Sequence, residues 1–383
     1  MSTPRLLRGG SDAADPRTAV AELYGQIGGS DTGFVLFFCS PNYDRAEIAA
    51  AILHYFSGIP VFGCTTAGEI TPFGYISGGL SGIAFPAGEF AVASTLFAPL
   101  EQFEIVAARE QAHRLMLRQK ALEAELSGDG QEPGRSFGLL LVDGLSFREE
   151  QLVSAIANTL NGVPMVGGSA GDGFKFRKSF VFHDGQFVAD AAILLLIQTR
   201  RRFSVFKTEH FVPTERKMVV TGADMDRRRV FELNGEPAAL EYARLVGLEG
   251  EHLSPRTFAA HPVVVRVGGE YHVRAIQRVN SDNSLSFFCA IDEGLVLTLA
   301  KGVDILEDLR ALFTRLEHQT GIPEAIIGYD CVLRNIELEQ RHLKEAVSEL
   351  FVEHKVIGFC TYGEQYMSMH VNQTFTGVAI GAA

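Results

Sequence analysis

The sequence is poor in the features that mark exported, membrane-spanning and disulfide-bonded proteins. Its 383 residues include five cysteines, an odd number at wide spacing with no CxxC pair: Cys39, Cys64, Cys289, Cys331 and Cys360. Such usage is typical of a reducing cytosol. The longest apolar stretch, residues 191–197, is far shorter than the ~20 residues that cross a bilayer, and no signal-peptide run opens the chain. We therefore expect a cytoplasmic protein without a membrane anchor.

Positive charge is scarce as well. The chain has 34 Lys and Arg against 46 Asp and Glu, which gives a formal net charge of −12, and its cations are scattered. A nucleic-acid-binding surface needs clustered cations to neutralise phosphates, so nucleic acid is not an expected partner. The one dense basic run, residues 227–229, is most simply a solvated turn.

Catalytic and metal-binding signatures are missing too. The sequence contains neither a GxxxxGK[ST] motif nor a GxGxxG motif at the start of a helix, so no nucleotide-binding motif is found. The eleven histidines include no HxxxH pair of the kind that binds zinc. Cys64, in a glycine-rich turn, could act as a nucleophile. A cysteine nucleophile needs a histidine as its base, however, and no histidine occupies the matching position in any of the three repeat copies described below. We therefore expect a binding protein and not an enzyme.

One pattern occurs three times in the chain, at residues 34–69, 138–172 and 325–364. Each copy has a short apolar strand, an amphipathic helix, a second short strand and a turn of small residues. The strands are continuously apolar, which is typical of strands covered on both faces, so parallel βαβ units follow. Because 383 residues are long for one core, we predict an α/β fold in which repeated βαβ units form two packed α/β domains with mixed sheets.

Every copy ends with a turn that contains a Ser or Thr, a glycine and an acidic residue, directly after the end of a buried strand. In open α/β sheets that end is where ligands bind. We therefore expect Gly68, Gly171 and Gly363 to occupy equivalent turns, with a tighter turn in the shorter second copy. A ligand-facing role and a turn-stabilising role both stay open for the candidates: Thr66, Gly68, Glu69, Ser169, Gly171, Asp172, Thr361, Gly363 and Glu364.

Several of these segments resemble a known family. Residues 58–70 (GIPVFGCTTAGEI) and 162–172 (GVPMVGGSAGD) resemble the turns of the FIST N domain, and residues 230–248, 356–366 and 372–381 resemble the FIST C domain. The resemblance implies an intracellular signal-input protein, found in this family alone or fused to output domains. It divides the chain into an N-terminal helix or arm at residues 1–30, a FIST N domain at 31–222 and a FIST C domain at 223–383.

A narrower resemblance, to the nitric-oxide-sensing haem proteins of the NosP family, implies haem b as cofactor and nitric oxide as ligand. It also implies a partner histidine kinase, or a cyclic-di-GMP cyclase or phosphodiesterase, in two-component and biofilm signalling, with a homodimer as a candidate assembly. FIST modules elsewhere are proposed to bind amino acids. The alternative is therefore a haem-free sensor of a small metabolite such as an amino acid.

If haem binds, His210 is the first candidate for the axial ligand. It lies between the two FIST-like segments, and Phe206 and Phe211 are close enough in sequence to sandwich a porphyrin. Interfaces between domains are also favoured places for pockets. A hydrogen-bonded linker histidine is the competing interpretation. The weaker candidates for the ligand are His261, His272 and His370.

Overall fold

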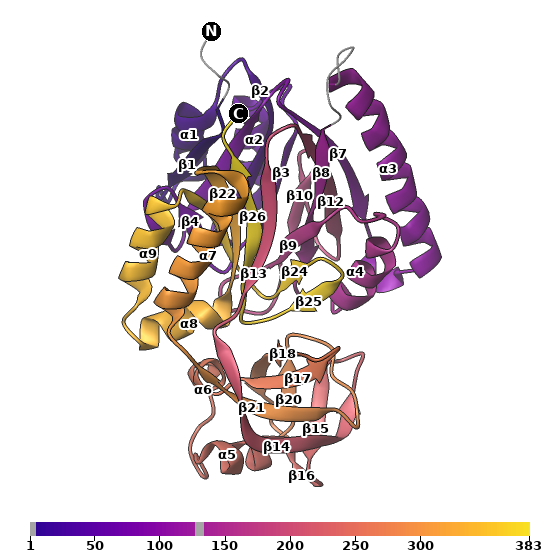
Figure 1. The fold of residues 1–383 in the computed structure, drawn as a ribbon, viewed down its shortest axis with the longest axis vertical. Helices are drawn as coiled ribbons and strands as arrows, with labels where there is room; N and C mark the ends of the chain where they lie inside the picture. The colour runs from indigo at the N-terminus through magenta and orange to yellow at the C-terminus, as the bar shows by residue number, and fades with distance from the viewer. Residues whose placement is uncertain (1–4, 127–133) are drawn as a thin grey trace.

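The computed structural model describes residues 5–126 and 134–383 (Figure 1). Most of them form a core of three similar units, repeats 1 to 3, and residues 209–304 form an insert within repeat 3. Each repeat runs strand, helix, strand, helix, strand, hairpin and final strand. This order extends the predicted βαβ pattern in both directions.

The elements of the repeats have the following bounds. Repeat 1 contains β1 (Leu7–Ser11), α1 (Pro16–Ile27), β2 (Thr32–Cys39), α2 (Arg45–Tyr55), β3 (Val61–Thr65), β4 (Glu69–Thr71), β5 (Gly74–Ile76) and β6 (Leu80–Pro86). Repeat 2 contains β7 (Phe90–Phe97), η1 (Leu100–Gln102), α3 (Ile105–Leu126), β8 (Arg135–Asp143), α4 (Glu149–Ala157), β9 (Met165–Ala170), β10 (Val181–His183), β11 (Gln186–Val188) and β12 (Ala192–Thr199). Repeat 3 contains β13 (Phe203–Thr208), α7 (Ile305–Thr320), β22 (Pro323–Cys331), α8 (Val332–Gln340), α9 (Lys344–Glu353), β23 (Val356–Thr361), β24 (Glu364–Tyr366), β25 (Met369–Val371) and β26 (Phe375–Gly381).

The three repeats exchange their hairpins in a ring. In each repeat the two strands around the second helix are parallel, as predicted: β2 with β3, β8 with β9, and β22 with β23. The hairpin of repeat 2 extends the sheet of repeat 1, that of repeat 3 extends the sheet of repeat 2, and that of repeat 1 extends the sheet of repeat 3. Each six-stranded sheet is therefore mixed and built from two repeats.

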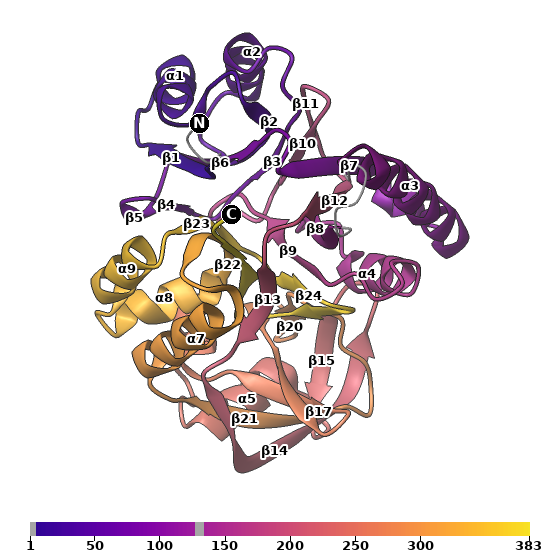
Figure 2. The same ribbon diagram turned by 45° about the horizontal axis from the view of Figure 1, so that its top comes forward.

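The sheets share one central core. Their inner faces pack together through alternate apolar residues of the strands, such as Phe38, Leu139 and Ile327. Their outer faces are covered by the helices of their own repeats, which lie around the outside of the molecule (Figure 2). Burial on both faces is the reason that these strands read as continuous apolar runs.

The insert has a core of its own and lies below the repeats in Figure 1. Its eight strands form an antiparallel sheet. They are β14 (Phe211–Asp224), β15 (Arg229–Leu233), β16 (Glu236–Pro237), β17 (Val263–Val267), β18 (Glu270–Arg274), β19 (Ile276–Val279), β20 (Leu285–Phe287) and β21 (Val296–Gly302), joined by the helices α5 (Ala238–Val246) and α6 (Pro255–Ala260). The insert leaves the core after β13 and returns before α7, and β14 and β21 pair beside this connection.

The mixed α/β architecture is confirmed. The predicted boundary between residues 222 and 223 falls inside β14, and the predicted arm at residues 1–30 supplies β1 and α1, with residues 1–4 outside the described part. Within residues 5–126 and 134–383, no helix combines the length and the apolar character needed to span a bilayer.

Candidate functional site

The three predicted turns meet at the centre of the core. As predicted, Gly68, Gly171 and Gly363 each follow the last parallel strand of a repeat, and none lies in a helix. Backbone bonds join the turns in a ring: Cys360 N donates to Gly68 O (2.7 Å), Ser169 N to Gly363 O (2.8 Å) and Gly171 N to Thr65 O (3.0 Å). A Cβ on Gly363 would lie only 2.3 Å from Cε1 of His370, so a side chain there would have to displace the imidazole. We call this meeting point the hub.

The acids of the first and third turns are hydrogen-bonded inside the hub. Glu69 is fully buried and accepts from the Thr66 hydroxyl (2.5 Å) and from Gly79 N (3.0 Å). Glu364 is likewise buried and accepts from the hydroxyl groups of Thr361 and Thr374. Burial raises the pKa of Glu69 to about 7 and that of Glu364 to about 8. In this conformation both carboxyls bind their own chain.

The second copy departs from the other two. Its hairpin begins with Val181, which pairs with Cys64 of repeat 1, whereas the hairpins of the other copies begin with Glu69 and Glu364. Asp143, at the end of β8, is also buried in this copy; it accepts from the Ser179 hydroxyl, and burial raises its pKa. The expectation of a tighter second turn is therefore wrong, because residues 171–180 form a loop between β9 and β10.

This loop and the ends of β2 and β3 enclose a cavity of about 230 Å³, which we call the strand-end cavity. It lies at the carboxyl ends of two parallel strands, the position predicted from the repeat, and Asp172 is the predicted ligand residue that lines it. Its lining comes from β2 and the following residues (Cys39, Ser40, Pro41, Tyr43), α2 (Arg45, Ile48), β3 (Thr65), the loop (Asp172, Lys175, Arg177, Lys178, Phe180) and β11 (Phe187).

Four cations gather at this cavity in a chain that carries an excess of acids. Arg45, Lys175, Arg177 and Lys178 are all exposed, and in the described part of the chain none has a carboxylate within ion-pair distance. The Arg45 guanidinium lies 4.2 Å from the centre of the Phe180 ring, a cation–π arrangement. The cavity thus combines an apolar lining with free positive charge.

Asp172 does not neutralise these cations, because its carboxylate is fully engaged with the loop. It accepts from the amides of Phe176 (2.7 Å), Arg177 (2.8 Å) and Lys178 (2.9 Å) and from the Tyr362 hydroxyl (2.5 Å). Burial would raise the pKa of Asp172, but these hydrogen bonds outweigh it and lower the pKa. Asp172 therefore shapes the loop.

His210, the first candidate for haem ligation, is buried in an ion-pair network. Its Nδ1 lies 2.8 Å from Nη1 of Arg334 and its Nε2 lies 2.8 Å from Oε2 of Glu337. Since a guanidinium can only donate, Nδ1 accepts and Nε2–H donates to the carboxylate, which makes the imidazole neutral. Burial lowers the pKa of His210 against the opposing effect of Glu337. Neither ring nitrogen is left for iron in this conformation.

The two rings expected to sandwich a porphyrin do not come together around His210. Phe211 packs against the imidazole, with 4.1 Å between ring centres, whereas Phe206 packs on Phe375 inside repeat 3. The other histidines lie apart. His370 contacts Gln365 and the Phe288 carbonyl, His272 is buried with an unpartnered Nδ1, and His261 ends α6. No group of three or more metal-ligating side chains occurs among the described residues.

Two further residues differ from the sequence-based interpretation. Cys64 lies within β3 and is buried, and burial raises the pKa of its thiol, which opposes formation of a nucleophilic thiolate. The basic run at 227–229 is a turn, but it is not fully solvated. Arg228 is 2% exposed and pairs with Glu149 and Glu150 of α4, each at 2.5 Å. Its partners are far away in sequence, so no local pattern indicates this contact.

Comparison with known proteins identifies the family. A model of the FIST N domain matches residues 33–236, and a model of the FIST C domain matches residues 238–367. The chain belongs to the FIST family. FIST domains are sensor domains of signal transduction, which places this chain among signalling proteins. The two matches divide the chain inside the insert, so the FIST C match contains most of the insert and most of repeat 3.

Two individual similarities add little to this assignment. An uncharacterized protein of Methanocaldococcus jannaschii is 26% identical over 268 residues, which are 60% of this chain and 51% of that protein. This chain thus spans about half the length of the curated relative that it matches. Among solved structures, a cyanuric acid hydrolase from A. caulinodans aligns over 100% of both chains with a TM-score of 0.36 and 8% identity. A similarity at that level carries no functional argument.

Proposed function

We propose that this FIST protein is a sensory input component that binds a small anionic metabolite in the strand-end cavity. The observation that carries the proposal is the group of four unpaired cations around an apolar cavity at the carboxyl ends of β2 and β3. In open α/β sheets this end of the strands is the usual ligand site. The family supplies the sensory role, and the cavity supplies a place for the ligand.

The charge of the cavity favours a carboxylate-bearing ligand. Arg and Lys side chains donate to carboxylates, and Arg does so with a planar pair of N–H groups. The Asp172 carboxylate already accepts from its own loop and from Tyr362, so an amino group on the ligand would have to compete with these hydrogen bonds. A ligand with more negative than positive charge, such as an acidic amino acid or a dicarboxylate, therefore fits better than a neutral amino acid.

The size of the cavity supports a small ligand. Its volume of about 230 Å³ lies below the range of roughly 300–1,000 Å³ that is usual for pockets that hold drug-sized molecules. The apolar side chains Ile48, Phe180 and Phe187 would contact the carbon skeleton, while the cations hold the carboxylates at the rim. This division of roles is common in small-molecule sites.

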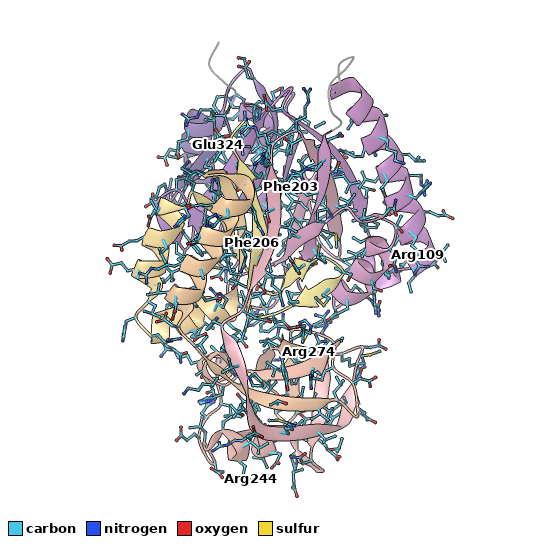
Figure 3. All side chains as sticks on the ribbon, viewed as in Figure 1. Arg109, Phe203, Phe206, Arg244, Arg274 and Glu324 are labelled. Atoms are coloured by element: carbon cyan, nitrogen blue, oxygen red, sulfur yellow. The ribbon has the colours of Figure 1, made fainter. Side chains whose placement is uncertain are left out.

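Isothermal titration calorimetry of the full chain against L-glutamate, L-aspartate, succinate, L-leucine and inorganic phosphate tests the proposal. We expect the three acidic compounds to bind, and the double substitution Arg177→Gln/Lys178→Gln to weaken binding at least about tenfold, since hydrogen bonds to charged groups contribute about 1.5–3 kcal/mol each. Arg109→Gln is the matched control, because Arg109 lies on α3 (Figure 3), which contributes no residue to the lining of the cavity. Absence of binding, or equal weakening by both variants, would overturn the proposal.

Haem and nitric oxide are the competing proposal, which rests on the NosP-like resemblance. His210 does not fit an axial ligand in this conformation, because both ring nitrogens are hydrogen-bonded. Titration of the purified chain with haem distinguishes the two proposals. A Soret band that disappears in His210→Ala but persists in His261→Ala, His272→Ala and His370→Ala would favour haem. No band in the wild type would favour the metabolite.

The output of the sensor is proposed to be a partner protein. The family resemblance suggests a histidine kinase or a cyclic-di-GMP cyclase or phosphodiesterase. The bound ligand can shift such a partner only if the partner has different affinities for the empty and loaded forms. Binding of the candidate partner, measured with and without 10 mM L-glutamate as the probe, should therefore differ, and equal affinities would contradict this part of the proposal.

A further inference from the structure

The loop that closes the strand-end cavity also contacts the insert. On one side, Lys175, Arg177 and Lys178 line the cavity. On the other side, the Phe176 ring packs against Tyr362, with 4.9 Å between ring centres, and against Phe288 of the insert, at 5.7 Å. The loop is thus the wall between the proposed ligand and the insert.

The loop is tied together as one unit. The carboxylate of Asp172 holds the amides of residues 176, 177 and 178, so the backbone that carries two of the cations also carries Phe176. Phe176 has a φ of 50°, in the left-handed region that non-glycine residues rarely adopt. Such conformations often mark switch regions, where surrounding contacts hold the strained backbone.

The insert is joined to the core by two chain connections and packs on it through a shared buried apolar cluster. Its two connections to the core lie side by side, with Phe211 of β14 opposite Gly302 of β21, and adjacent connections of this kind can act as a hinge. Away from that connection, two contacts hold the insert on the core: the Phe288 carbonyl lies 3.3 Å from Nε2 of His370, and Arg228 pairs with Glu149 of α4 at 2.5 Å. Figure 3 labels Arg274 on this edge of the insert, which faces the core.

We propose that occupancy of the strand-end cavity sets how the insert docks on the three-repeat core, and that Phe176 transmits the change through Tyr362 and Phe288. The proposal rests on the proposed ligand site. A carboxylate that draws Arg177 and Lys178 toward the cavity pulls the Asp172-bound backbone with them. The Phe176 ring then shifts against Phe288, and the insert rotates relative to the core about the paired connections of β14 and β21.

Hydrogen–deuterium exchange of the full chain, measured with and without 10 mM L-glutamate, tests the transmission. We expect the ligand to change exchange by about fivefold or more, the low end of allosteric coupling, in peptides of the insert that cover residues 284–290. Peptides of α7 should not change. Phe176→Ala should keep binding in calorimetry while the exchange difference in the insert is lost.

Phe174→Ala is the matched control, because Phe174 lies in the same loop, is 55% exposed and does not line the cavity. This variant should keep both binding and transmission. If L-glutamate binds but leaves the insert unchanged, or if Phe176→Ala still transmits, the coupling is wrong while the ligand site stands.

If L-glutamate does not bind, the proposed function fails first, and the coupling is tested in the ligand-free protein. Truncating the insert side of the contact by Phe288→Ala should speed exchange at the amides of residues 176–178, which Asp172 protects. Phe231→Ala, an exposed residue of the insert, should not. Unchanged exchange in Phe288→Ala would overturn the coupling on its own.

Discussion

Replacing Glu364 with glutamine should stabilise the protein at alkaline pH. The carboxyl is fully buried, one oxygen contacts the Thr361 hydroxyl, and the other accepts from the amide and hydroxyl of Thr374. A glutamine offers the same shape, with an oxygen for Thr374 and an NH₂ group for Thr361. It therefore imitates the protonated acid and can never become a buried charge.

The magnitude follows from the pKa of Glu364, which burial raises from 4.5 to about 8. Between these values the folded state holds a proton that the unfolded state has lost, so the free energy of unfolding decreases as pH rises. The contribution is fully present below pH 4.5 and is lost by about pH 8. At about 1.4 kcal/mol per pKa unit, the loss is on the order of 5 kcal/mol.

Urea-unfolding midpoints at pH 5, 6.5 and 8, followed by circular dichroism, measure this loss. The gain of Glu364→Gln over the wild type should be small at pH 5 and should grow toward pH 8. Glu349→Gln, at an exposed acid of α9, is the control and should show no such growth. A pH dependence in Glu364→Gln equal to that of the wild type would refute the buried neutral carboxyl.

Three other perturbations test different parts of the structure. Burial lowers the pKa of His210, so the contribution of the neutral imidazole to stability is present above pH 6.5 and is lost as pH falls. In His210→Gln the melting temperature should therefore decrease less between pH 6.5 and acidic pH than in the wild type. Arg228→Met should destabilise by about 3–5 kcal/mol, because it leaves the buried carboxylate of Glu149 unpaired, whereas exposed Arg227→Met should change urea midpoints little. Gly167→Ala should prevent soluble expression, since its Cβ would lie 1.9 Å from the Leu140 carbonyl oxygen; normal yield would contradict this close approach of β8 and β9.

The sequence was sufficient to predict what is local in this fold. Apolar strands around an amphipathic helix indicated each βαβ unit, and the three glycine turns were correctly placed at strand ends. These features depend on residues within one repeat copy, which is why periodicity alone finds them.

The sequence could not show how distant segments pair. The ring of exchanged hairpins joins strands of different repeats, and their registers depend on tertiary packing. The neighbours of His210 on α8 are more than 120 residues away in the chain, so no local sequence pattern indicates that it belongs to an ion-pair network. Arg228 was misread for the same reason: its charge suggested solvent, while its partners in repeat 2 keep it buried.

The differences between the repeats indicate where a ligand site can exist in this fold. In repeats 1 and 3 the turn acid is a glutamate at the first position of the hairpin, and its carboxyl is hydrogen-bonded inside the hub. In repeat 2 the turn acid is Asp172, which organises a loop of ten residues instead. Residues of that loop line the strand-end cavity, and Phe176 of the same loop contacts the insert. Because threefold symmetry fails at this loop, we expect the proposed ligand site once in the chain and not three times.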